Sequence, residues 1–236
     1  MASLRPRIAG LTSAALDLVF PRWCLGCGRE GGYICEYCRT ALPIIAPPIC
    51  DRCGRPLSGG AHCAVCAGGD AAIDGIRSPF LFEGVVRQAV HEFKYNNLRD
   101  LAPTLAGMLH EYVTKNPLPG EVLAPVPLHS HRLRERGYNQ SALVAKELGR
   151  LMGMPVVEDC LVRCGQAPPQ VRSAGAEERR RNVATAFACQ DRRLAGKKVI
   201  LVDDVSTSGA TLNSCAAVLK SAGAASVWGL VIALEK

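Results

Sequence analysis

The chain has 236 residues, which suffices for one large α/β domain or for an ordinary domain with a smaller one beside it. Apolar residues make up 48% of the chain and charged residues 21%, which excludes a disordered, collagen-like or coiled-coil protein. The formal net charge is +7, and no uncharged apolar run reaches about 18 residues, so we expect no membrane span.

Residues 1–22 are predicted to form an amphipathic helix. Asp17 interrupts the apolar stretch that follows Arg5 and Arg7, so we expect a helix of the protein rather than a cleaved secretion signal. The apolar positions that recur at helical spacing are Ile8, Leu11, Ala15 and Leu18.

Residues 23–69 hold eight of the twelve cysteines, arranged as four C-x2-C pairs. Two cysteines three residues apart on a tight turn can bind one cation, and two such turns complete a tetrahedral site. Disulfide bonds are the main alternative, but closely spaced C-x2-C pairs are unusual in disulfide frameworks. A redox-active C-x-x-C motif is a further alternative, but it does not need four copies. We therefore predict a double zinc ribbon with two structural Zn²⁺ ions, which also favours a reducing cytoplasm. The predicted ligands are Cys24, Cys27, Cys35, Cys38, Cys50, Cys53, Cys63 and Cys66.

The sequence leaves open which cysteine pairs share a metal. Sequential pairing closes the shortest loops and is preferred. A segment of about 45 residues with little apolar content cannot build its own core, so metal binding would supply folding energy. Residues 1–69 contain seven basic and four acidic side chains, and eight thiolates with two dications would bring this segment near −1. The basic composition is therefore weak evidence for nucleic-acid binding.

Residues 73–236 are predicted to alternate strands and helices. Apolar strands separated by helices imply parallel pairing and an α/β layered fold. The segment 163–182, with five arginines and no apolar period, is predicted to be a long loop. The expected strands are 80–84, 122–126, 198–202 and 226–234, with an extended piece at 155–157. The expected helices are 85–95, 101–114, 141–152 and 209–222.

The segment 199–211 carries the strongest functional pattern. Four apolar residues predict a buried strand, two acids follow where it should emerge, and a hydroxyl- and glycine-rich turn then opens a helix. Open α/β sheets bind ligands at this end of their strands. The turn can hold a phosphate, whereas the acids would repel it and suit a sugar diol with a cation nearby. The predicted binding residues for such a ribose 5-phosphate group are Asp203, Asp204, Ser206, Thr207, Ser208, Gly209, Ala210 and Thr211.

This segment resembles the phosphoribosyl pyrophosphate (PRPP) signature of the type I phosphoribosyltransferases, with Ser208 where threonine is common. From about residue 21 to 234 the chain is similar to the ComF family, which is linked to DNA uptake in bacterial competence. The resemblance implies a type I phosphoribosyltransferase-like domain over 73–236, with a Rossmann-like parallel sheet flanked by helices, that binds PRPP with Mg²⁺. It rests on the cysteine pairs, on residues 125–128 (PVPL) and 136–140 (RGYNQ), and on Gln166 and 181–183 (RNV).

The resemblance also assigns a pyrophosphate-binding loop to residues 127–140, with Arg132, Arg134 and Arg136 as its candidates. A solvated basic face is the alternative for Arg132 and Arg134, whereas Arg136 opens the RGYNQ run. The loop 163–182 would cover the reacting centre, or its arginines would contact a nucleic-acid backbone or solvent.

Two functions stay open in the sequence. An enzyme would transfer phosphoribosyl from PRPP to an unknown nitrogen acceptor, with Asp203 and Asp204 as catalytic residues that stabilise positive charge at the anomeric carbon. Its acceptor site would come from residues before 122, because little chain follows the signature. The alternative is a non-catalytic module that binds a phosphoribosyl ligand and engages single-stranded DNA or a DNA-uptake protein.

Overall fold

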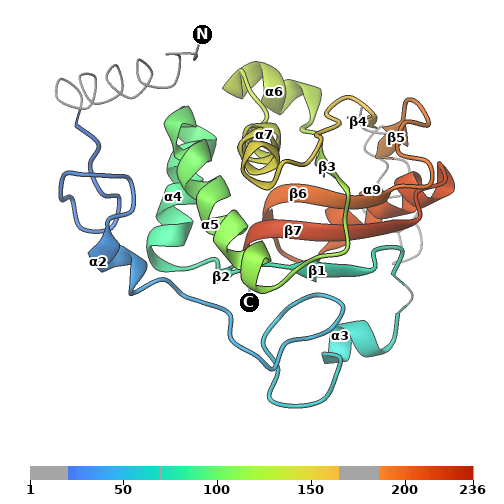
Figure 1. Cartoon of the computed structure of the whole chain (residues 1–236), viewed down its shortest axis with the longest axis horizontal. Helices are drawn as coiled ribbons and strands as arrows, with labels where there is room; N and C mark the ends of the chain where they lie inside the picture. Colours follow the sequence, from blue (N-terminus) through green and yellow to red (C-terminus); the bar gives the residue numbers. More distant parts are fainter. Residues whose placement is uncertain (1–20, 70, 165–185, 236) are drawn as a thin grey trace, which may run out of the picture.

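A computed structural model describes residues 21–69, 71–164 and 186–235 of the chain. Within these ranges a parallel sheet carries helices on both faces, and two small cysteine ribbons lie outside this core, one against the helical layer and the other against an edge strand of the sheet (Figure 1). The expected α/β fold with an N-terminal ribbon module is confirmed. Most of the predicted N-terminal helix and of the predicted loop 163–182 lies outside the described residues.

Five parallel strands form the sheet in the order β1-β7-β6-β3, with β2 pairing to β7 further along its length. β6 and β7 occupy the centre, so their middle residues are apolar and buried on both faces. The strands are β1 (Gly75–Arg77), β2 (Phe80–Leu81), β3 (Val122–Pro125), β6 (Lys198–Ser206) and β7 (Ser226–Leu234).

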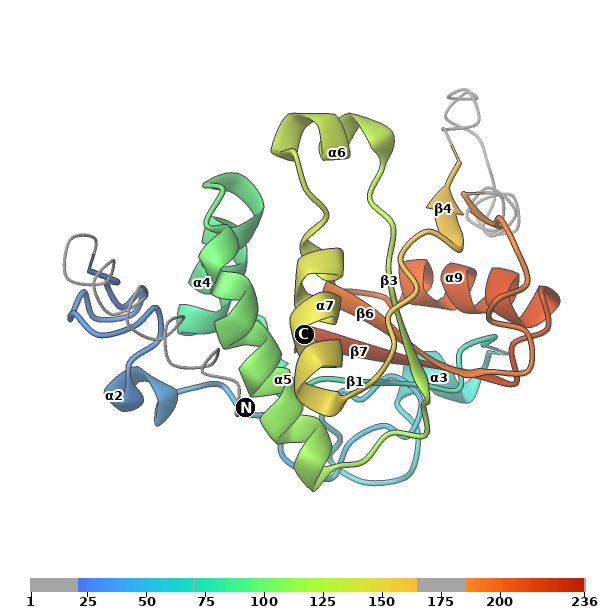
Figure 2. The ribbon, with the colours of Figure 1, turned by 45° about the horizontal axis from the view of Figure 1, so that its top comes forward.

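Helices cover both faces of this sheet (Figure 2). Ile200 and Val202 of β6 pack in the core under α4, α5 and α7, whereas Val199 and Leu201 pack in the core under α9. This alternation follows because successive side chains of a strand point to opposite faces. The helices are α4 (Gly84–Tyr95), the short 3-10 helix η1 (Arg99–Leu101), α5 (Ala102–Lys115), α7 (Gln140–Met152) and α9 (Ala210–Ser221).

The structure corrects the expected strand boundaries. β6 continues to Ser206, four residues beyond the predicted end at 202, because β7 pairs with it as far as Leu234. Asp203 and Asp204 therefore lie inside the strand. The predicted strand 80–84 is only two residues long in the structure, as β2. β1 was not predicted, because three residues are too few to show a hydrophobic period.

The connections also differ from expectation. The segment 127–140 contains a seven-residue helix, α6 (Ser130–Arg136), which begins after His129 and ends at Gly137 in the left-handed conformation (φ 74°). β4 (Leu161–Arg163) and β5 (Phe187–Cys189) form an antiparallel pair that was not expected from periodicity. Residues 155–157 are extended as predicted, through a parallel bridge from Val156 to Leu123.

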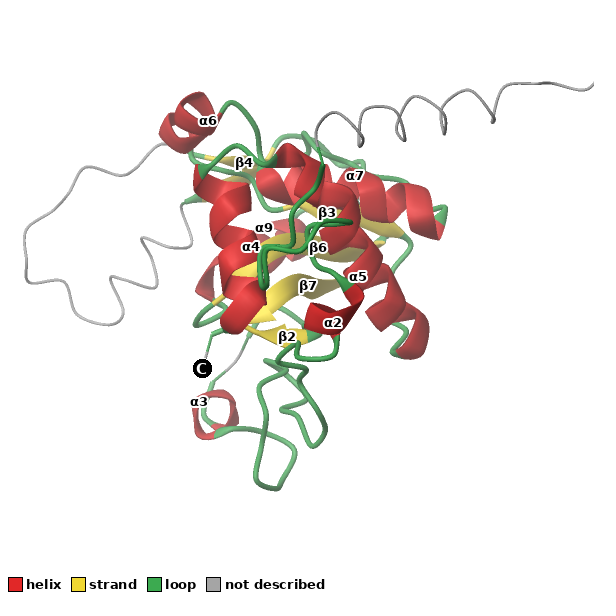
Figure 3. Ribbon diagram, turned by 90° about the vertical axis from the view of Figure 1, so that its left-hand side faces the viewer, coloured by secondary structure: helices red, strands yellow, loops and turns green. Residues whose placement is uncertain are grey.

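We call residues 22–42 the first ribbon and residues 49–69 the second ribbon. Each contains one four-residue helix, α2 (Glu36–Arg39) or α3 (Ala64–Ala67), and otherwise consists of turns and loops (Figure 3). The chain between the ribbons runs along β2, where the Ile45 N–H donates to the Pro79 carbonyl and the Leu81 N–H donates to the Pro43 carbonyl. Among the described residues, no helix has the length and apolar character needed to cross a membrane.

Candidate functional site

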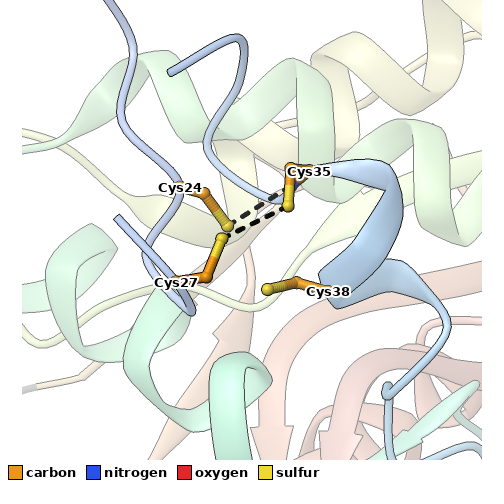
Figure 4. Close-up of side chains that lie close together, drawn as sticks. All are labelled: Cys24, Cys27, Cys35 and Cys38. Atoms are coloured by element: carbon orange, nitrogen blue, oxygen red, sulfur yellow. Dashed lines mark hydrogen bonds between the residues drawn. The ribbon is translucent and has the colours of Figure 1, made fainter. Parts of the chain in front are cut away.

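The eight cysteines of the ribbons form two clusters of four thiols. Cys24, Cys27, Cys35 and Cys38 make the first cluster (Figure 4), and Cys50, Cys53, Cys63 and Cys66 make the second. Within each cluster all four sulfur atoms lie within 4.8 Å of one another. Four sulfur donors at this spacing fit a tetrahedral zinc ion. The grouping follows chain order, as the short closed loops favour.

The first cysteine of each cluster is prepared to act as a thiolate. Burial pushes the pKa of Cys24 upward, but hydrogen bonds from backbone N–H groups outweigh it and lower this pKa to about 6. The same balance lowers the pKa of Cys50 to about 6. In each case one of these donors is the N–H of the third cysteine of the cluster, at 3.4 Å from the sulfur. A thiol must lose its proton to bind a metal, so backbone N–H groups that lower its pKa favour metal binding.

Asp203 and Asp204 lie side by side near the carboxyl end of β6 and have different partners. Oδ1 of Asp203 accepts hydrogen bonds from the Ser141 hydroxyl and from the Asp204 N–H, each at 2.9 Å. Oδ1 of Asp204 lies 2.7 Å from Nζ of Lys94 on α4. Burial, and then the neighbouring negative charge of Asp204, raise the pKa of Asp203 to about 7. One acid is therefore paired with a cation, and the other titrates near neutral pH.

Asn139 fixes the beginning of α7 beside this pair. Its side-chain oxygen accepts a hydrogen bond from the Ser141 N–H at 3.1 Å, as an N-cap does. Its amide nitrogen donates to the Val126 carbonyl at 3.0 Å, just after β3. Since β3 pairs directly with β6, this side chain holds the start of α7 at the edge of the sheet where the Ser141 hydroxyl reaches Asp203.

Residues 207–209 connect β6 to α9, and we call the segment 206–211 the turn, from the last residue of β6 to the first two residues of α9. Thr207 and Ser208 are exposed, and Oγ of Ser208 accepts a hydrogen bond from the Ala210 N–H at 3.3 Å. Gly209 has φ +77°, and a Cβ there would lie 2.9 Å from Cδ1 of Ile76, so both the backbone and the available space favour glycine. The turn lines a small hollow with Asp203, to which residues 205–212 all contribute.

The three candidate arginines of the segment 127–140 lie on α6. Arg132 and Arg134 are exposed, and within the described part of the chain neither forms an ion pair. Arg136 is half-buried, with its guanidinium 5.0 Å from the ring centre of Tyr95 on α4. The structure thus brings Arg136 next to the residue that follows Lys94, and leaves the other two facing solvent.

A cavity of about 340 Å³ lies between α4 and the end of β6, and Lys94, the partner of Asp204, is among its lining residues. One stripe of α4 forms a wall of it, because residues three or four apart lie on the same side of a helix. Thr207 of the turn also lines the cavity, and so does Glu235, the residue that follows β7. The lining residues are Phe82, Arg87, Val90, His91, Lys94, Tyr95, Val205, Thr207 and Glu235.

Sequence patterns alone did not identify Lys94 or Arg55 as residues of this region, nor Asn139 and Ser141. The sequence pattern predicted a cation near the acids, and in the structure this cation is Lys94. Lys94 lies one helical turn after Val90, at the border of the apolar face of α4. Arg55 of the second ribbon donates a hydrogen bond to the Thr207 carbonyl in the turn. No local pattern marks Arg55, because its partner lies 152 residues away in the chain.

Two family models match the chain, the double zinc ribbon domain over residues 15–67 and the phosphoribosyl transferase domain over residues 164–235. Competence protein F of Haemophilus influenzae is 31% identical over 208 residues, which cover 84% of this chain and 89% of that protein. Competence protein ComFC of Bacillus subtilis is 29% identical over 199 residues, which cover 81% of this chain and 80% of that protein. The solved glutamine PRPP amidotransferase of B. subtilis matches with a TM-score of 0.41 and 19% identity, over 56% of this chain and 26% of that chain.

Proposed function

The chain belongs to the ComF family of competence proteins, and on this premise we propose that it binds PRPP with Mg²⁺ and transfers phosphoribosyl to a nitrogen acceptor, in a role linked to DNA uptake. The observation that carries the proposal is the succession of groups at the end of β6. Two acids are followed at once by a hydroxyl-rich turn and by the beginning of the twelve-residue helix α9. The grouping of the thiols of both ribbons as metal ligands rather than as disulfide pairs supports a reducing, cytoplasmic setting.

Each part of this succession suits one part of the ligand. The 5-phosphate lies in the turn 206–211, where backbone N–H groups and the positive end of the α9 dipole favour an anion. The ribose diol donates to Asp203 and Asp204, whose negative charge Lys94 partly neutralises. Mg²⁺ bound with PRPP would stabilise charge on the pyrophosphate. Arg136, whose guanidinium lies 5.0 Å from the ring centre of Tyr95 on α4, is the arginine of α6 that we assign to support it.

Catalysis in this proposal is electrostatic. As the bond to pyrophosphate breaks, positive charge develops at the anomeric carbon, and the two carboxylates stabilise it more in the transition state than in the ground state. The ionised form of Asp203 dominates above its pKa of about 7.

The cavity beside α4 is the proposed acceptor site. It shares Val205 and Thr207 with the hollow of the turn, so a molecule in it lies next to the bound sugar. Aromatic and apolar groups of Phe82, Val90 and Tyr95 line it together with charged ends, which suits a planar nitrogen compound with a polar edge.

The test is calorimetric titration of PRPP with Mg²⁺ into the full chain. The double variant Asp203→Asn, Asp204→Asn should bind PRPP about 100-fold more weakly or not at all, because it loses two charged acceptors. Asp159→Asn removes an exposed acid that pairs with Arg193 and is the matched control. Unchanged affinity in the double variant would refute the site.

Pyrophosphate release across a panel of bases and amines then tests the transfer step. Release that depends on one acceptor, and that stops in the double variant, is the expected result. Tight PRPP binding without release from any member would favour the non-catalytic module.

One observation supports that second function. α6 projects from the sheet (Figure 2). Its Arg132 and Arg134 are exposed, and the apolar Leu133 between them is 43% exposed. Such a helix suits contact with single-stranded DNA or with a partner protein of DNA uptake. Salt-sensitive binding of an oligonucleotide, lost in Arg132→Glu with Arg134→Glu, would favour this function.

A further inference from the structure

The second ribbon touches the phosphate-binding turn directly. The guanidinium of Arg55 donates a hydrogen bond to the carbonyl of Thr207, whose neighbours line the hollow beside Asp203. Arg55 lies two residues after the cluster ligand Cys53. Its backbone carbonyl accepts a hydrogen bond from the N–H of another ligand, Cys50, at 2.8 Å. The position of this arginine is therefore fixed by the same turn that holds two of the thiols.

A second path runs from the ribbon to the turn through β1. The Ile76 N–H donates to the Arg52 carbonyl at 2.7 Å, and Arg77 donates to the Asp51 carbonyl at 2.9 Å. Gly54 approaches β1 so closely that a Cβ there would lie 2.5 Å from the Ile76 carbonyl oxygen. The side chain of Ile76 packs against the turn. Its Cδ1 atom is so close to Gly209 that a Cβ added there would lie only 2.9 Å from it.

The chain after the ribbon is tied to the same helix that the turn opens. Oδ1 of Asn213, in the first turn of α9, accepts hydrogen bonds from the N–H groups of Ala72 at 2.7 Å and Ile73 at 3.2 Å. Three contacts thus connect the second ribbon with the turn. Arg55 binds the turn itself, the ribbon backbone binds Ile76 of β1, which packs against the turn, and the chain just after the ribbon binds Asn213 of α9.

We propose that the second ribbon positions the phosphate-binding turn, so that metal loading of its four cysteines and binding of a phosphoribosyl ligand strengthen each other, with Arg55 as the positioning residue. This inference rests on the proposed function for the identity of the ligand. The physical reason is that the carbonyl of Thr207 is held by a side chain whose own backbone is ordered only when the ribbon is folded, and a ribbon this small needs its metal to fold. Coupling of this kind is reciprocal between the two sites.

The first ribbon provides the internal control. Within the described residues, its side chain and glycine contacts with the rest of the domain go to α4 and α5: Arg39 pairs with Glu111 at 2.6 Å, and Gly26 packs near Val85. Among the described residues, neither of these two contacts reaches residues 206–211. Loading of its metal should therefore stabilise the fold without changing ligand affinity.

The first measurement is PRPP affinity of the zinc-loaded full chain by calorimetry. Arg55→Ala should weaken binding about 3-fold to 10-fold with the zinc content unchanged, because one hydrogen bond from a charged donor is lost. Arg55→Lys, which keeps a donor, should recover part of the loss. Arg39→Ala removes an arginine of the first ribbon and should leave the affinity as it is. Equal affinities for wild type and Arg55→Ala would overturn the proposal.

The second measurement needs no ligand. Amide hydrogen exchange over residues 205–211 should accelerate several-fold in Arg55→Ala, and also when a chelator removes the zinc of the wild type. Stripping the metal from Arg55→Ala should add less acceleration than it does in the wild type, since the Arg55 link is already absent and only the contacts through β1 and Asn213 remain. Additive effects of the variant and the chelator would mean that Arg55 does not transmit the state of the ribbon, and would overturn the proposal.

The two measurements also separate this inference from the function on which it rests. If wild type binds no PRPP while exchange in the turn depends on Arg55 and on zinc as expected, the proposed ligand is wrong and the link between ribbon and turn stands. If PRPP binds and neither readout depends on Arg55, the ligand stands and the link is wrong.

Discussion

The two ribbons share one local design and differ in what they touch. In both, the third cysteine precedes a four-residue helix with nearly the same backbone angles, φ −73° at Cys35 and φ −74° at Cys63. In both, a glycine directly after the second cysteine has a left-handed backbone, φ +71° at Gly28 and φ +72° at Gly54. Backbone N–H groups lower the pKa of the first thiol in each. The metal-binding chemistry of the two ribbons is therefore the same.

Their surroundings give them different consequences. The first ribbon packs on the helical layer, where Arg39 pairs with Glu111 of α5. The second ribbon packs on β1 and reaches the turn through Arg55. A metal cluster is built by local residues, but its effect on a distant site depends on which face of the domain it orders.

The largest expected effect comes from removing one ligand of each cluster. Cys27→Ser and Cys53→Ser should each lower the zinc content from about two ions per chain to about one. Each should cost on the order of 5 kcal/mol of stability, since structural zinc supplies ~10 kcal/mol or more to small ribbons. Metal analysis and denaturant unfolding measure both quantities. The comparison predicts that Cys53→Ser alone also weakens PRPP binding.

Two outcomes of that experiment would break the comparison. A zinc content near zero in wild type prepared without chelator would remove the ribbon interpretation for both clusters. An equal loss of PRPP affinity in Cys27→Ser and Cys53→Ser would mean that the ribbons act through general stability rather than through the turn.

An intermediate effect is expected at the matched glycines. Gly54→Ala adds a Cβ 2.5 Å from the Ile76 carbonyl, a backbone atom that cannot move aside without shifting β1. Gly28→Ala meets no atom within 4 Å and carries only the strain of a left-handed alanine, about 1 kcal/mol. We expect Gly54→Ala to cost roughly 3 kcal/mol, because both terms apply there. Thermal unfolding of the two variants measures the difference, and equal shifts in Tm would show that the second ribbon does not press on β1.

The smallest effect is expected at the contact of the first ribbon with α5. Arg39 makes a two-pronged hydrogen bond to Glu111 at 2.6 and 2.8 Å, but the Glu111 side chain is 59% exposed. Solvent screens such pairs, so Arg39→Ala should cost less than about 1 kcal/mol. Urea unfolding gives this value. A cost of several kcal/mol would mean that the first ribbon, too, is coupled to its neighbours through a single arginine.

The sequence determined the features whose partners are close in the chain. The cysteine clusters follow from C-x2-C spacing and short loops, and β6, the turn and α9 follow from one continuous segment of residues. Helices with a clear apolar period, such as α4 and α7, begin and end within one or two residues of the predicted positions. In each case the deciding interactions are local hydrogen bonds, local periodicity or local ligand geometry.

Only the tertiary structure decided the contacts around the acids and the turn. Lys94 and Ser141 reach Asp204 and Asp203 from two different helices, and Arg55 reaches Thr207 from the second ribbon. The length of β6 was also decided there, because its last four residues are held in the strand by pairing with β7 rather than by their own propensity. The residues next to Lys94, Ser141 and Arg55 in the sequence do not indicate these contacts, because the folding of the sheet brings the partners together from separate parts of the chain.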